Sequence, residues 1–136
     1  MRALILLIVC WIGFATPGCA EDDVAAAQAV ISSQVEAIGR DDAETAYAFA
    51  TPDIHNMIVD AQTFLVIVRE HYAPIYRHKG FKFGEARVSD DTIAQEVHIV
   101  DAEGVPWEAL YTLERQPDGS IKISGCILMK TPGEPV

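Results

Sequence analysis

The sequence predicts one α+β domain, in which N-terminal helices pack on one face of a curved, mainly antiparallel four-strand sheet. Apolar residues recur every three or four positions through the first half, which is typical of helices, and alternate with polar residues after Gly80, which is typical of strands. Short turns rich in Asp and Gly separate the alternating segments, which makes neighbouring strands antiparallel. The 136 residues suffice for a single core. Such a sheet wraps a long helix and leaves a cavity at one end.

The first twenty residues resemble a secretory signal peptide. A positive start at residues 1–2 precedes an apolar run over residues 3–15, and the small residues Gly18 and Ala20 stand before an acidic stretch. This order predicts export, with the mature protein periplasmic or secreted.

The cleavage site has three readings. Cleavage after Ala20 gives a mature domain over residues 21–130 with a flexible tail at residues 131–136. Cleavage after Ala15 would leave Cys19 in the mature protein. In the third reading Cys19 is acylated, and the protein is a lipoprotein anchored to the envelope.

Three helices are expected in the mature chain, over residues 22–38, 42–50 and 52–72. Asp residues stand at the start of the first two, and Thr51 followed by Pro is a typical start for the third. The third carries the longest apolar stripe, and Pro74 limits it.

Four strands are expected after Gly80. In the last strand one alternating set is Ile121, Ile123, Ile127 and Met129, and the other set includes Cys126 and Leu128. The expected strands cover residues 81–88, 93–99, 105–113 and 121–129.

Composition excludes several functions. The formal net charge is −10, and nucleic-acid binding needs a basic surface instead. Three cysteines are too few for a disulfide scaffold, and Cys126 is expected to be a small buried hydrophobe, with a redox thiol as the alternative. The four histidines lack the spacing of a metal site, and neither a catalytic triad nor a phosphate-binding loop is present. No cofactor, metal or catalytic residue is therefore expected.

Two groups of motifs carry a resemblance over roughly residues 24–129. They are Asp41-Asp42 followed by Ala46-Tyr47-Ala48-Phe49-Ala50, and the series Gln95-Glu96-Val97, Trp107-Glu108-Ala109, Asp118-Gly119 and Gly125-Cys126. The chain resembles a family of small exported bacterial proteins catalogued as a domain of unknown function. The order of its elements resembles the nuclear-transport-factor-like (cystatin-like cone) superfamily. The resemblance implies a cone-shaped fold and brings no assigned activity.

Some proteins of this cone shape are enzymes that use a Tyr donor with an Asp or His base in the cavity. The candidate cavity residues here are Tyr47, Tyr72, Trp107, Tyr111 and His98. The alternative is that the aromatic residues fill the core and satisfy their polar tips at the surface.

Positive charge gathers in one part of an otherwise acidic chain, at Arg69, Arg77, Lys79, Lys82 and Arg87. This patch is a candidate surface for an anionic partner, and the alternative is a solvated loop.

The function expected from these observations is a non-catalytic binding or interaction module of the bacterial envelope. It would hold a small apolar ligand or a protein partner, including a second copy of itself. It would be anchored to a membrane only if Cys19 were acylated. The alternative is a small cavity enzyme of the proton-transfer or hydration type.

Overall fold

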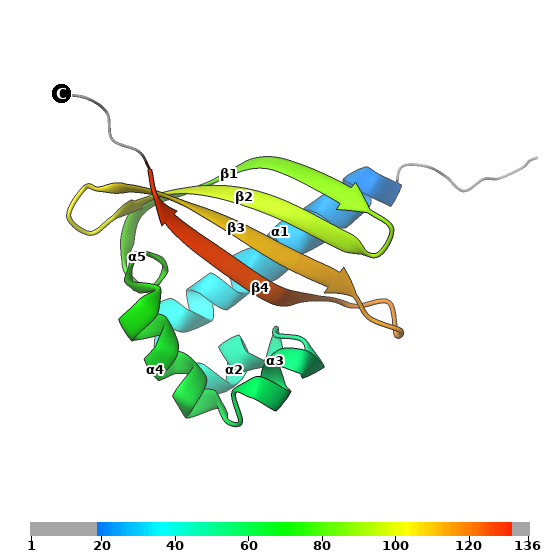
Figure 1. The fold of residues 1–136 in the computed structure, drawn as a ribbon, viewed down its shortest axis with the longest axis horizontal. Helices are drawn as coiled ribbons and strands as arrows, with labels where there is room; N and C mark the ends of the chain where they lie inside the picture. Colours follow the sequence, from blue (N-terminus) through cyan, green and yellow to red (C-terminus); the bar gives the residue numbers. More distant parts are fainter. Residues whose placement is uncertain (1–18, 132–136) are drawn as a thin grey trace, which may run out of the picture.

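A computed structural model describes residues 19–131 of the chain (Figure 1). The helices come first and a four-strand antiparallel open sheet follows, which confirms the predicted α+β class. The helices are α1 (Cys19–Gly39), α2 (Ala43–Ala48), α3 (Pro52–Met57), α4 (Ala61–His71) and α5 (Ala73–Tyr76). The strands are β1 (His78–Ser89), β2 (Thr92–Asp101), β3 (Pro106–Arg115) and β4 (Ile121–Lys130).

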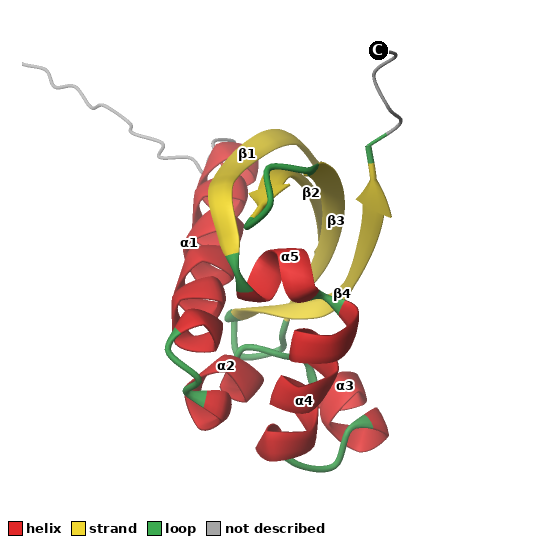
Figure 2. Ribbon diagram, turned by 90° about the vertical axis from the view of Figure 1, so that its left-hand side faces the viewer, coloured by secondary structure: helices red, strands yellow, loops and turns green. Residues whose placement is uncertain are grey.

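The sheet is strongly curved, and the helices lie to one side of it (Figure 2). Helix α1 packs against β1, β2 and β4, whereas α2, α3 and α4 gather at one end of the molecule. The side chains of Ala27, Ile31 and Ile38 on α1 are almost fully buried, as the apolar stripe of this helix predicts.

The prediction of a single helix over residues 52–72 is wrong, because the chain breaks between α3 and α4. Ile58 has an extended backbone, with φ −120° and ψ 104°. The Asp60 carboxylate then accepts a hydrogen bond of 2.7 Å from the backbone N–H of Thr63 and caps a new helix. The spacing of the apolar residues does not reveal this break, because the apolar stripe continues from α3 into α4.

The strand order is β1-β2-β3-β4, with each strand antiparallel to the next. Two of the predicted turns contain a glycine in the left-handed region, Gly104 with φ 85° and Gly119 with φ 91°. Only glycine adopts this conformation without strain, so both turns follow directly from the sequence.

A bulge in β4 reverses the alternation that the sequence predicts. Leu113 pairs with Ile123 but Thr112 pairs with Gly125, so Ser124 is the extra residue. The prediction that Ile127 and Met129 share a face with Ile121 and Ile123 is therefore wrong. Ile127 is 58% exposed and Met129 is 51% exposed, while Cys126 and Leu128 pack against the core instead.

Several predictions concern residues 1–18 and 132–136, which lie outside the described part of the chain. These are most of the predicted signal peptide, whose last two residues begin α1, and most of the predicted tail. Cys19 is placed in the first turn of α1, and nothing is described of its side chain. Among the described helices, none is long and apolar enough to cross a membrane.

Candidate functional site

A cavity of about 290 Å³ lies between the helices and the end of the sheet formed by β3 and β4, and its helical side comes from α3, α4, α5 and the last turns of α1. This volume is near the lower limit of the pockets that hold small organic ligands. Most of the wall is apolar, and its members include Ile38, Ile54, Phe64, Val68, Ile75 and Ile123. Its polar members are Gln34, Tyr72, Tyr111, Ser124 and Cys126.

The two departures from the expected secondary structure both contribute to this cavity. The break after α3 brings Met57 and Ile58 to the wall, to which α4 also contributes residues. The bulge at Ser124 turns Cys126 to the inner face of β4, where it pairs with Tyr111 of β3. Regular elements would have placed these side chains elsewhere.

Tyr111 is the most unusual residue of the wall. It is 2% exposed, and among the described residues its buried hydroxyl has no hydrogen-bond partner. Burial raises the pKa of Tyr111 well above its ordinary value, with smaller contributions from Cys126 and Tyr72. A buried hydroxyl without a partner costs about 1–3 kcal/mol, so folded proteins seldom contain one.

Tyr72 and Cys126 lie beside Tyr111 in the same wall. The Tyr72 hydroxyl donates a hydrogen bond of 3.2 Å to the backbone carbonyl of Cys126. Burial, followed by Cys126, raises the pKa of Tyr72, and burial raises the pKa of the Cys126 thiol to about 12. A reactive thiol needs a lowered pKa, so this environment favours the prediction of a small buried hydrophobe.

The structure brings Tyr72 and Tyr111 together in the cavity and places Tyr47 outside its wall. The Tyr47 hydroxyl donates to the backbone carbonyl of Ile58, and its ring stacks on His55 with centroids 3.9 Å apart. Tyr47 therefore supports the chain where α3 ends.

Trp107 and His98 also lie outside the cavity wall. The Trp107 indole donates a hydrogen bond of 2.9 Å to Asp101, which fixes the turn between β2 and β3. His98 is exposed, and its Nδ1 lies 3.5 Å from a carboxylate oxygen of Glu108. Alternation along the strands explains this position, because His98 and its neighbour Glu108 point away from the helices.

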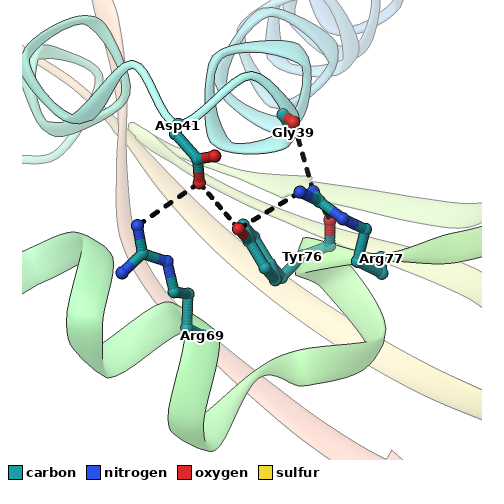
Figure 3. A network of polar contacts seen from close by, with 5 residues as sticks. All are labelled: Gly39, Asp41, Arg69, Tyr76 and Arg77. Carbon is teal, nitrogen blue, oxygen red and sulfur yellow. Dashed lines mark hydrogen bonds and ion pairs between the residues drawn. The ribbon is translucent and has the colours of Figure 1, made fainter.

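The candidate patch of positive charge divides into two parts. Arg69 and Arg77 belong to a corner where α4 and α5 meet the loop after α1 (Figure 3). Asp41 accepts hydrogen bonds from the Tyr76 hydroxyl at 2.7 Å and from Arg69 at 3.4 Å. Arg77 lies over the Tyr76 ring at 3.9 Å and donates to the Gly39 carbonyl at 3.1 Å. These two arginines are therefore engaged within the fold.

The remaining three residues of the patch, Lys79, Lys82 and Arg87, are exposed along β1. Lys82 pairs with His98 in the sheet register, and Arg87 pairs with Ala94. The five cations thus do not form one cluster, because two of them bind within the corner and the other three are spread along β1 from Lys79 to Arg87.

Sequence reasoning missed Gln34 and Ser124 as cavity residues. Gln34 stands on the apolar side of α1, is 4% exposed and donates a hydrogen bond of 3.2 Å to the carbonyl of Ala46. A glutamine within an apolar helical stripe indicates a buried polar group, so Gln34 could have been predicted as a cavity candidate from the sequence. The position of Ser124 depends on the bulge, for which only Gly125 offers a hint.

Within residues 19–131 no group of three or more His, Cys, Asp or Glu side chains is arranged to hold a metal ion. The polar groups of the wall are amide, hydroxyl and thiol groups. At neutral pH these groups form hydrogen bonds and carry no charge.

A protein-family model matches residues 20–136 of the chain, and its description is "Domain of unknown function (DUF4864)". No curated protein and no solved structure matches the chain.

Proposed function

The chain belongs to the DUF4864 family, and we propose that it is a non-catalytic binding module that holds a small apolar ligand in the cavity between α3, α4 and the β3–β4 end of the sheet. The observation that carries this proposal is the cavity itself. Its wall is mostly apolar and includes Tyr111, whose buried hydroxyl has no partner among the described residues. Apolar walls with a few polar groups are typical of small-molecule sites.

The proton-transfer alternative needs an acid or base beside the cavity tyrosines. The described wall contains no Asp, Glu or His. His98, the one candidate base named from the sequence, lies beside Glu108 on the outer face, and the Asp60 carboxylate caps α4. Binding therefore accounts for the wall better than proton transfer does.

We also propose that the protein acts in the bacterial envelope and that its fold is a nuclear-transport-factor-like cone. The signal-like segment at residues 1–20 supports export, with Cys19 acylation as the alternative. A long helix packed on a curved antiparallel sheet supports the cone.

Native mass spectrometry tests the proposed function. The full chain is expressed with its own N-terminal segment in a bacterium, released from the envelope and measured before and after denaturation. We expect the mass of residues 21–136 plus a mass that is lost on denaturation. Mass that survives denaturation would instead identify a lipid on Cys19, which the variant Cys19→Ala would remove.

A matched pair of variants localises the ligand. Ile67 lines the cavity and is half-buried, whereas the neighbouring Val66 is 43% exposed and lies outside the wall. Ile67→Trp should fill the cavity and abolish the bound mass, while Val66→Trp should retain it. A wild-type protein with nothing bound would overturn the proposal, and the exposed Ile127 and Met129 would become the surface to test for a second copy.

A further inference from the structure

We propose that the ligand of this cavity is a neutral, largely apolar molecule whose single hydrogen-bond acceptor, a ketone or ester carbonyl, binds the hydroxyl of Tyr111. The inference rests on the proposed function and adds the chemical class of the ligand and the residue that recognises it. Three features of the cavity carry it: the position of Tyr111, the absence of charge in the described wall, and the volume.

Tyr111 lines the cavity, and its buried hydroxyl can donate a hydrogen bond that no described residue accepts. Tyr111 belongs to the wall, and the groups that influence its hydroxyl are Cys126 and Tyr72, two other wall residues. The Tyr72 hydroxyl already donates to the carbonyl of Cys126, whereas the Tyr111 hydroxyl has no partner among the described residues. A ligand oxygen within reach would therefore gain a hydrogen bond and relieve the cost of a buried free donor.

The wall disfavours an anion. Among the described residues it contains no Lys, Arg or His that could neutralise a carboxylate or phosphate. Burial raises the pKa of Tyr72, Tyr111 and Cys126, which shows that negative charge is unfavourable at this end of the sheet. The acceptor is therefore an uncharged oxygen.

The volume limits the size of the ligand. A cavity of about 150 Å³ holds one benzene molecule, so 290 Å³ accommodates about ten to fifteen non-hydrogen atoms. One polar atom among these matches the Tyr111 hydroxyl in a wall that is mostly apolar. A larger or more polar molecule would leave polar atoms buried without partners.

Three probes of similar shape test the inference. They are 2-acetylnaphthalene, which has a neutral carbonyl, 2-ethylnaphthalene, which has no acceptor, and 2-naphthoate, which is charged at pH 7. Binding is followed by NMR of the backbone amides of Gly125 and Cys126, both in the wall. We expect the ketone to bind most tightly and the carboxylate at least tenfold more weakly.

Two variants identify the recognising hydroxyl. Tyr111→Phe should weaken the ketone about fivefold to tenfold, as expected for one hydrogen bond, and leave the hydrocarbon unchanged. Tyr47→Phe is the matched control, because its hydroxyl already donates to the carbonyl of Ile58 and Tyr47 lies outside the wall, and it should preserve the preference for the ketone.

The possible results separate the inference from the proposed function. If ketone and hydrocarbon bind equally and Tyr111→Phe changes neither, the binding function stands and the inference is overturned. If the carboxylate binds most tightly, the claim of a neutral ligand is overturned. If no probe shifts the wall amides, both the inference and the proposed function fail.

Discussion

Two buried polar side chains on the inner face of the sheet differ in one respect, the number of their partners. Gln95 on β2 is fully buried, and its amide has several hydrogen bonds. Tyr111 on β3 is 2% exposed, and its hydroxyl has none among the described residues. Burial of an unpaired polar group is unfavourable, so we infer that the two residues have different roles.

Gln95 joins three parts of the fold. Its oxygen accepts a hydrogen bond of 3.0 Å from Gln28 on α1, and its nitrogen donates to the carbonyls of Gly84 at 3.1 Å and Glu96 at 2.8 Å. Gly84 lies within the irregularity of β1 between Phe83 and Ala86. A saturated amide of this kind stabilises one arrangement of helix and strand, whereas the unpaired hydroxyl of Tyr111 leaves a bond for another molecule.

The largest effect is expected for Gln95→Leu. The change keeps a similar volume but leaves the Gly84 and Gln28 groups without their partner, which should lower the free energy of unfolding by about 2–4 kcal/mol. Urea denaturation followed by circular dichroism measures this loss.

Glu96→Leu is the control for Gln95→Leu, because Glu96 is the next residue of β2 and is exposed. It should change the free energy of unfolding by no more than about 0.5 kcal/mol. Equal losses in the two variants would contradict the role assigned to the Gln95 amide.

This contrast also shows what the sequence could predict. Alternation along β2 identifies Gln95 as inward-facing between Ile93 and Val97, and the helical and strand periods predicted the order of elements. The resemblance, together with the apolar stripes, predicted Tyr72 and Tyr111 as cavity residues. It also predicted Tyr47, Trp107 and His98, which lie outside the wall. Cys126 reaches the cavity wall through the bulge in β4, and Met57 reaches it through the break between α3 and α4. Both are tertiary choices that local spacing does not encode.

The second-largest effect is a loss of stability at alkaline pH, because the buried Cys126 thiol beside the cavity resists ionisation in the folded protein. Between pH 9 and 12 the Cys126 thiol ionises in the unfolded chain but stays protonated in the folded one, because burial raises its folded pKa to about 12. The unfolded state then binds fewer protons, so stability falls as pH rises through this range. From pH 8 to 10.5 the loss from this group is about 2 kcal/mol.

Urea denaturation of the wild type and of Cys126→Ala at both pH values measures this loss. The alanine variant should lose about 2 kcal/mol less than the wild type, because both proteins retain the tyrosines whose pKa values are also raised. Equal losses in the two proteins would show that the thiol is not desolvated in the folded state.

A third prediction concerns two identical chemical changes at neighbouring residues. In the ligand-free protein Tyr111→Phe removes a buried hydroxyl without a partner and should raise the free energy of unfolding by about 1 kcal/mol. Tyr72→Phe removes a donor that is bonded to the Cys126 carbonyl and should lower it by a similar amount. Thermal unfolding distinguishes the two signs. A loss of stability in both variants would mean that Tyr111 has a partner in the folded protein.

The smallest effect is expected at the exposed corner of Asp41, Tyr76 and Arg69, where water competes with every contact (Figure 3). The hydrogen bond from the Tyr76 hydroxyl, followed by the contacts of Arg69, lowers the pKa of Asp41 below its ordinary 3.8. The folded state therefore binds fewer protons than the unfolded state at acid pH, and the stability from this carboxylate is lost as pH falls below about 4.

Asp41→Asn suits the test, because asparagine tolerates the positive φ of 60° at this position. Its melting temperature should be slightly lower than that of the wild type at pH 6, and the difference should shrink at pH 3. A difference that stays constant with pH would assign the contribution of Asp41 to the shape of its loop rather than to its charge.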